Sequence, residues 1–193
     1  GLAPDHTLML VNGKRRHRAS VITWLGNGIS NGSQGPDAAA IPALALKRIE
    51  VLRDGASAQY GSDAIAGVMN FVLNDGREGG SVEVRYGEYK EGDGEQVTIA
   101  GNIGLPLGDS GFLNLTAEWG ESDPTSRSEQ RADAQGLIDD GYQGVPVPAM
   151  IWGRPIVKDD MKLWANFGVD LSDTLELYGH ANYNSKEVDG GFF

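Results

Sequence analysis

Two hydrophobic patterns divide the chain. Before residue 74, apolar residues come in short compact runs, such as residues 7–11 and 66–73, which suit buried strands and are too short for a helix with its own apolar face. After residue 75, apolar and polar residues alternate with a period of two, which is typical of strands with one apolar and one polar face. The pattern therefore predicts two regions in different surroundings that meet near residues 74–76.

The compact region is predicted to form a mixed sheet with turns at its ends. Asn12-Gly13 is a turn dipeptide, and the Gly- and Ala-rich stretch 55–67 is expected to be coil in which backbone lies close to another surface. Residues 37–48 predict a short helix or a pair of turns that Asp37 could cap. The predicted strands are residues 7–11, 49–52 and 66–73.

The alternating region predicts strands that keep their charges on one face. That polar face includes Glu83, Glu118 and Lys162, and a charge that faced lipid would cost about 2–4 kcal/mol at mid-membrane. The long connection 120–160 is expected to hold a helix within residues 126–140, capped by Ser126 or Ser128. The five predicted strands are residues 81–86, 96–103, 112–119, 161–170 and 174–184.

Residues 49–70 carry a long motif, I-E-V-L-R-D-G-A-S-A-Q-Y-G-S-D-A-I-A-G-V-M-N. It resembles the plug-domain signature of TonB-dependent outer-membrane receptors. Asp54-Gly55 stands where the signature usually has Gly-Pro, and Met69 stands where it has Ile. Both departures keep the turn and the apolar position.

The resemblance implies a fold and a domain division. The expected fold class is an α+β plug fragment followed by antiparallel all-β strands of a transmembrane β-barrel, and the barrel would be incomplete. Residues 1–74 would be the C-terminal part of the plug domain. Residues 75–193 would be the first five or so barrel strands, with a long extracellular loop at 120–160. Because the chain begins at Gly1 without an initiator Met, we expect it to be a piece of a larger protein.

The resemblance also implies a function and partners. A receptor of this family would bind a scarce ligand at the surface of a Gram-negative bacterium and import it across the outer membrane. The energy would come from the inner-membrane TonB complex, contacted through a segment N-terminal to this chain. The expected partners are therefore TonB, outer-membrane lipid and a ligand such as a siderophore, cobalamin, a saccharide or a peptide. No cofactor is implied.

The candidate site residues follow from position in this family. The Gly/Asn/Ser-rich loop 24–36 matches the loop at the plug apex, and Tyr60 matches a signature tyrosine that can face the ligand. The ligand-binding candidates are Trp24, Asn27, Ser30, Asn31, Ser33, Gln34 and Tyr60. Structural roles within the plug signature are expected for Glu50, Arg53, Gly61, Gly67 and Asn70.

Charge and composition exclude several other functions. The net charge is −11, with 15 acidic and 5 basic residues in 75–141, so nucleic acid is not an expected partner. There is no Cys, and His6, His17 and His180 lack metal-ligand spacing, so no metal site is predicted. No catalytic constellation is present, and we expect no enzyme. No apolar run approaches the length of a membrane-spanning helix.

One rival interpretation stays open at this point, a soluble β-rich module that binds glycans. Such a module would use the same loop residues but would bury the apolar strand face against a second sheet. The two interpretations therefore differ in the apolar face of residues 161–183, which is exposed to lipid in one and buried in the other.

Overall fold

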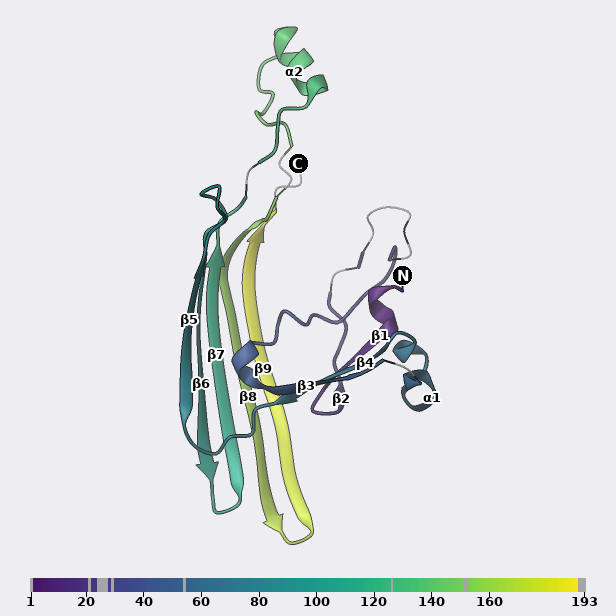
Figure 1. The fold of residues 1–193 in the computed structure, drawn as a ribbon, viewed down its shortest axis with the longest axis vertical. Helices are drawn as coiled ribbons and strands as arrows, with labels where there is room; N and C mark the ends of the chain where they lie inside the picture. The colour runs from purple at the N-terminus through teal and green to yellow at the C-terminus, as the bar shows by residue number, and fades with distance from the viewer. Residues whose placement is uncertain are drawn as a thin grey trace. The chain divides into compact units, whose positions relative to one another are not determined.

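A computed structural model describes residues 2–20, 22–23, 28, 30–53, 55–125, 127–150 and 153–190. Its strands form two sheets, a four-stranded sheet in the order β2-β1-β4-β3 and a five-stranded sheet in the order β5-β6-β7-β8-β9 (Figure 1). The first sheet has the strands β1 Thr7–Val11, β2 Lys14–Arg15, β3 Leu46–Leu52 and β4 Gly67–Leu73. The second has β5 Gly80–Gly87, β6 Gln96–Leu107, β7 Gly111–Ser122, β8 Ile156–Ser172 and β9 Leu175–Asp189.

The helices are short. The described α-helices are α1 Ala56–Tyr60 and α2 Ala132–Asp139, and the described 3-10 turns are η1 Pro4–His6, η2 Ala43–Ala45 and η3 Ser62–Ala64. Over the part of the chain that the structure describes, no helix is both long and apolar enough to cross a membrane.

The four-stranded sheet is mixed, as predicted. β1 runs antiparallel to β2 and parallel to β4, while β3 runs antiparallel to β4. Asn12 and Gly13 join β1 to β2 with φ of 48° and 74°, the left-handed conformation that a two-residue hairpin turn needs. A side chain at Gly67 would lie 2.4 Å from the Leu52 carbonyl oxygen, so this approach of β4 to β3 requires glycine.

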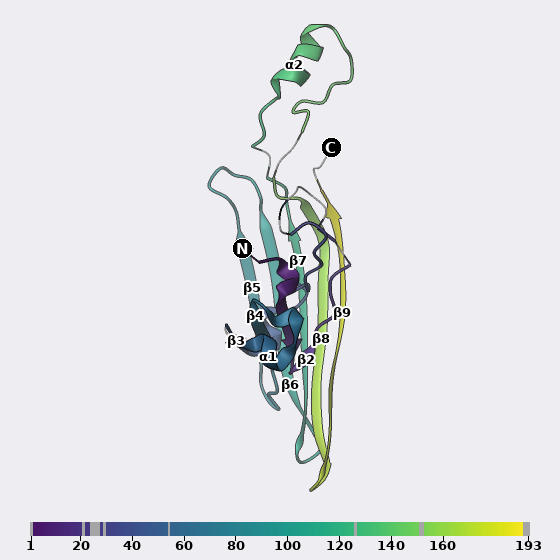
Figure 2. The ribbon, with the colours of Figure 1, turned by 90° about the vertical axis from the view of Figure 1, so that its right-hand side faces the viewer.

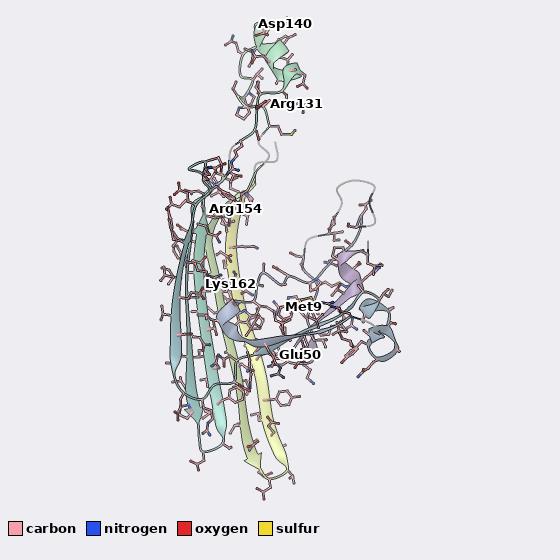
Figure 3. All side chains as sticks on the ribbon, in the orientation of Figure 1. Met9, Glu50, Arg131, Asp140, Arg154 and Lys162 are labelled. Carbon is pink, nitrogen blue, oxygen red and sulfur yellow. The ribbon has the colours of Figure 1, made fainter. Side chains whose placement is uncertain are left out.

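Both faces of β1 are covered, which explains why this strand is a continuous apolar run. On one face, Leu8 and Leu10 pack with Val68 beneath α1 and η3. On the other face, Met9 and Val11 belong to a second cluster (Figure 3). The buried members of that second cluster are Met9, Val11, Ile41, Ala45, Phe71, Leu73 and Trp164.

The compact region corrects one prediction and confirms two. The stretch 55–67 is not coil, because it forms α1 and η3, whose Ala56 and Ala64 are buried against the sheet. Residues 37–48 form turns as predicted: Asp37 Oδ1 accepts the Ala39 amide at 3.0 Å, and η2 follows. The strand predicted at residues 49–52 is confirmed as β3 but begins at Leu46.

The five-stranded sheet confirms every predicted strand, and the observed strands are longer, although β9 begins one residue later than predicted, at Leu175. Neighbouring strands are consecutive in the chain and antiparallel, and β8 and β9 run side by side along their length (Figure 2). The apolar row is exposed: Val82 on β5 and Leu177 on β9 are 80% and 50% accessible. On β7 the polar row is buried, with Asn114 and Glu118 at 4% and 7%. This central strand of the sheet therefore buries its polar face.

The long connection between β7 and β8 contains the predicted helix within residues 126–140, but its cap was predicted wrongly. α2 begins at Ala132, and its N-cap residue is Arg131, which makes no side-chain cap hydrogen bond. Ser126 lies outside the described residues. Asp133 in the first turn accepts the amide of Ala134 at 2.9 Å instead.

The chain forms two compact units. The first comprises Gly1–Ser81, Asn102–Thr116 and Trp164–Asn182, and the second comprises Val82–Gly101, Ala117–Leu163 and Tyr183–Phe193. The four-stranded sheet thus shares its unit with parts of β6 to β9.

Candidate functional site

The predicted binding loop is the tip of a hairpin-like excursion from the four-stranded sheet. Arg18 and Pro36 form an antiparallel bridge, and the Ala19 amide donates to the Gly35 carbonyl at 2.9 Å. Further along, the Thr23 amide donates to the Ser33 carbonyl at 3.0 Å. These bonds connect the two sides of the base of the loop.

The predicted contact residues have different surroundings. Trp24 and Asn27 lie outside the described residues. Ser30 and exposed Asn31 form turns, with the Asn31 amide donating to the Gly28 carbonyl at 3.0 Å. Ser33 is buried, and its Oγ has no hydrogen-bond partner among the described residues.

Gln34 lines a cavity of about 160 Å³ together with the basic cluster that follows the Asn12-Gly13 turn, which is Arg15, Arg16, His17 and Arg18. Its side-chain amide also donates to the Ala19 carbonyl. Within the cavity, Asp63 of η3 pairs with Arg15 and lies 3.9 Å from the Arg18 guanidinium. The cavity is thus lined by several cations and by Asp5 and Asp63, so an anionic or polar group fits it best.

Tyr60, the remaining ligand candidate, lies in α1. Its ring is partly buried against the cluster of Leu8, Leu10 and Val68. It does not line the cavity that contains Gln34. The structure therefore brings Gln34 to the basic cluster and gives Tyr60 a packing contact, and the ligand role of each residue stays a prediction.

The signature residues are connected through Asn70. Its Nδ2 donates to Glu50 Oε2 at 2.9 Å, and its Oδ1 accepts the Gly13 amide at 2.9 Å. The hydrogen bond from Asn70, followed by one from Arg48 at 2.7 Å, lowers the pKa of Glu50 below its usual range. Asn70 thereby ties β3 to the hairpin turn across β4.

The other three signature residues are placed by the backbone around α1. Gly61 ends α1 with a φ of 87°, which favours glycine, and Gly67 is required by the close approach described above. Arg53 is exposed directly after β3, and no ion pair involving it is present among the described residues.

Trp164 lies on the polar face of β8, two residues after Lys162, and no role was predicted for it. It is 3% exposed, and its indole N–H donates to the Ala40 carbonyl at 2.9 Å. The Arg16 guanidinium lies 5.3 Å from its ring centroid, and His180 stacks on it at 6.3 Å. Burial lowers the pKa of Arg16, while the Asp37 carboxylate opposes that shift. Trp164 therefore fastens the four-stranded sheet to the polar face of β8.

An amide network continues this attachment through residues that the sequence analysis did not single out. Asn12 Nδ2 donates to Asn166 Oδ1 at 3.1 Å, and Asn166 Nδ2 donates to the Asn74 carbonyl at 2.9 Å. Asn102 Nδ2 donates to Asn114 Oδ1 at 2.6 Å. Asn74 Nδ2 donates a hydrogen bond to Asn102 Oδ1 at 3.3 Å. The signal available in the sequence was one asparagine on the polar face of each of three predicted strands, namely Asn102, Asn114 and Asn166.

The fold and this attachment define a class, a plug-like mixed sheet held on the polar face of antiparallel strands. Residues 1–68 match the family model of the TonB-dependent Receptor Plug Domain. The ferrienterobactin receptor of Escherichia coli K12 is 33% identical over 151 residues, which are 74% of this chain and 18% of that protein. A vitamin B12 transporter of Photobacterium profundum is 30% identical over 152 residues, which are 78% of this chain and 22% of that protein.

Two solved structures share the fold. The crystal structure of the ferric enterobactin receptor PfeA matches with a TM-score of 0.68 and 21% identity, covering 96% of this chain and 26% of that one. The siderophore receptor PirA from Pseudomonas aeruginosa matches with a TM-score of 0.61 and 20% identity, covering 96% and 27%. The chain thus spans about a fifth to a quarter of the proteins it matches.

These findings confirm the resemblance to TonB-dependent receptors and the predicted fold class. They give no support to a soluble glycan-binding module. Such a module needs a second layer over the apolar face of β8 and β9, where Leu163 and Leu177 are exposed.

Proposed function

We propose that this chain is part of an outer-membrane receptor of a Gram-negative bacterium, which binds a scarce ligand at the cell surface and imports it with energy from the TonB complex. In this proposal residues 1–74 are plug, residues 75–193 are the first barrel strands, and residues 120–160 form a loop outside the cell. The protein is a transport receptor and not an enzyme.

The observation that carries the proposal is the inverted burial of the five-stranded sheet. Exposed apolar side chains such as Val82 suit contact with lipid, and the buried polar face holds Asn114 and Glu118. The plug-like sheet is attached to that polar face through Trp164 and the asparagine network. These contacts join segments far apart in the chain, and they combine burial of Trp164 in the cluster around Met9 and Phe71 with hydrogen bonds between polar groups.

The ligand class follows from the relatives. Those that match are named as receptors for siderophores and as a transporter of vitamin B12. We therefore propose a ferric siderophore or a cobalamin as cargo. The apex of the excursion 18–36 and the cavity beside Gln34 are the proposed first contacts.

The test compares cells that carry the full-length protein with and without TonB. We expect labelled ferric enterobactin or cobalamin to bind both cell types and to be imported only when TonB is present. A tag at Asp140, in the loop after α2, should be labelled on intact cells. Import without TonB would contradict the energy source, and labelling only after lysis would contradict the location of the loop.

A further inference from the structure

Another cavity, of about 240 Å³, opens on the polar face of β5 to β8 within the second compact unit. Arg154, Ser122 and Lys162 are among its lining residues, together with Glu118 and Asp160. Arg154 lies just before β8 and Lys162 lies within it (Figure 3). Of the residues predicted to bind ligand, none that the structure describes lines this cavity.

Most charges in the cavity are already neutralised by one another. Glu118 accepts from Lys162 Nζ at 2.7 Å and from Arg85 Nη2 at 3.3 Å. Lys162 also lies 3.3 Å from Asp160 Oδ2. These ion pairs leave the carboxylates of buried Glu118 and half-buried Asp160 satisfied by cations, so they present little uncompensated negative charge to an incoming anion.

Two groups in the cavity are not neutralised or satisfied in this way. Arg154 Nη2 donates to the neutral Gln96 Oε1 at 2.8 Å, and no ion pair of Arg154 is present within the described ranges. Ser122 is 5% exposed, and its Oγ is buried with no hydrogen-bond partner there. A buried polar group without a partner costs about 1–3 kcal/mol, so a ligand that supplies the partner recovers that cost.

We propose that Arg154 and Ser122 form a seat for a carboxylate group. The planar guanidinium of Arg matches a carboxylate with two parallel N–H donors, and the serine hydroxyl supplies a third. The segment of Arg154 is held in place because its backbone amide donates to Thr125 Oγ1 at 2.8 Å. The seat is therefore positioned before a ligand arrives.

Size and charge restrict the occupant. The cavity is smaller than the roughly 300–1,000 Å³ of pockets that enclose drug-sized ligands, so it takes a small carboxylate or one carboxylate arm of a larger molecule. Its lining holds three basic residues, Arg85, Arg154 and Lys162, against three acidic ones, Glu118, Glu121 and Asp160. Because these formal charges balance, and Glu121 is exposed, a single carboxylate suits the seat better than a multiply charged anion.

The experiment measures binding of acetate to the full-length protein in detergent by saturation-transfer NMR at neutral pH. Arg154→Gln should weaken acetate binding about tenfold or more, and Ser122→Ala should weaken it severalfold. Arg131→Gln is the matched control, because Arg131 is an exposed arginine that pairs only locally with Asp133, and it should leave binding unchanged. Arg154→Lys keeps the charge, loses the planar fork and should give an intermediate affinity.

Circular dichroism and thermal unfolding of each variant establish that the fold is kept. Acetate binding that is unchanged in Arg154→Gln, or lost equally in Arg131→Gln, would overturn the seat. Displacement of acetate by triglycine but not by its methyl ester would extend the seat to a carboxylate on a larger ligand. Because binding and not import is measured, a failure here leaves the proposed transport function intact.

Discussion

The two sheets of this chain differ in which side chains their central strands bury. In the four-stranded sheet both faces of β1 are covered, and Leu8, Met9, Leu10 and Val11 are all buried. In the five-stranded sheet, β7 alternates strictly and buries Asn114, Thr116 and Glu118 while Leu115 is exposed. The comparison shows that the hydrophobic periodicity of a strand indicates whether one or both of its faces are buried. Which face is buried depends on the surroundings of the sheet.

The largest expected effect concerns the residue that connects the two sheets. Trp164→Ala removes a buried ring from the cluster around Met9 and Phe71 together with the indole N–H that donates to the Ala40 carbonyl. We expect a loss of about 3–5 kcal/mol in the free energy of unfolding, because a large aromatic leaves a cavity. The measurement is denaturant unfolding of the full-length protein in detergent.

Leu163→Ala is the control for this substitution, since Leu163 is the neighbour of Trp164 on the opposite, exposed face of β8. Its effect should be clearly smaller than that of Trp164→Ala. Equal losses in the free energy of unfolding for the two variants would show that the two faces of β8 are not packed differently. That result would contradict the proposed difference between the sheets.

An intermediate effect is expected at the exposed apolar face. Leu115→Arg places a charge in the middle of β7 on the row that we propose faces lipid. Folding into phospholipid vesicles should lose about 2–4 kcal/mol, because an arginine there leaves water for the hydrocarbon core. Leu115→Ile keeps the apolar surface and should fold almost as the original does. Efficient folding of Leu115→Arg would contradict the lipid-facing assignment of this row.

The smallest effect is electrostatic and belongs to the four-stranded sheet. The pKa of Glu50 is lowered by Asn70 and then Arg48, so its ionised form is stabilised in the folded protein. This stabilisation is present above the unfolded pKa of about 4.3 and is lost as the pH falls through the lower folded value. Glu50→Gln should therefore reduce stability near pH 7 and make little difference near pH 3.

Urea unfolding at pH 7 and at pH 3 measures the difference in stability between the two pH values. Glu78→Gln, which changes an exposed glutamate just after the compact region, is the comparison variant. It should leave the difference in stability between pH 7 and pH 3 unchanged. A Glu50→Gln protein with the same pH dependence as the original would show that the Asn70 and Arg48 hydrogen bonds do not stabilise the fold.

Several elements could be predicted from the sequence because their signals are local. The Asn12-Gly13 turn needs two left-handed residues, and the alternation in 81–184 needs only a period of two. The stretch 55–67 could not be predicted in this way, since its Gly and Ala residues suit coil as well as α1. It is helical because Ala56 and Ala64 pack onto the sheet, and part of that contact comes from Leu8 and Leu10 of β1, which is distant in sequence.

The candidate site was only partly predictable for the same reason. Gln34 was expected at the binding loop from its position, but its meeting with the cations of residues 15–18 and with Asp63 depends on how the excursion folds back. Ser122 and Arg154 carry no motif at all. They meet because two strand ends separated by a long connection lie beside each other in one sheet.

The sequence by itself determined the strands other than β2, the sense of their alternation and the plug signature of residues 49–70, because periodicity and motif depend on neighbouring residues. The tertiary structure alone decided that Trp164 packs in the cluster around Met9, that Asn12, Asn74 and Asn166 form a network, and that Ser122 Oγ has no hydrogen-bond partner among the described residues. The physical reason is that burial and hydrogen bonding are properties of pairs of residues, and here the members of each pair come from segments far apart in the chain.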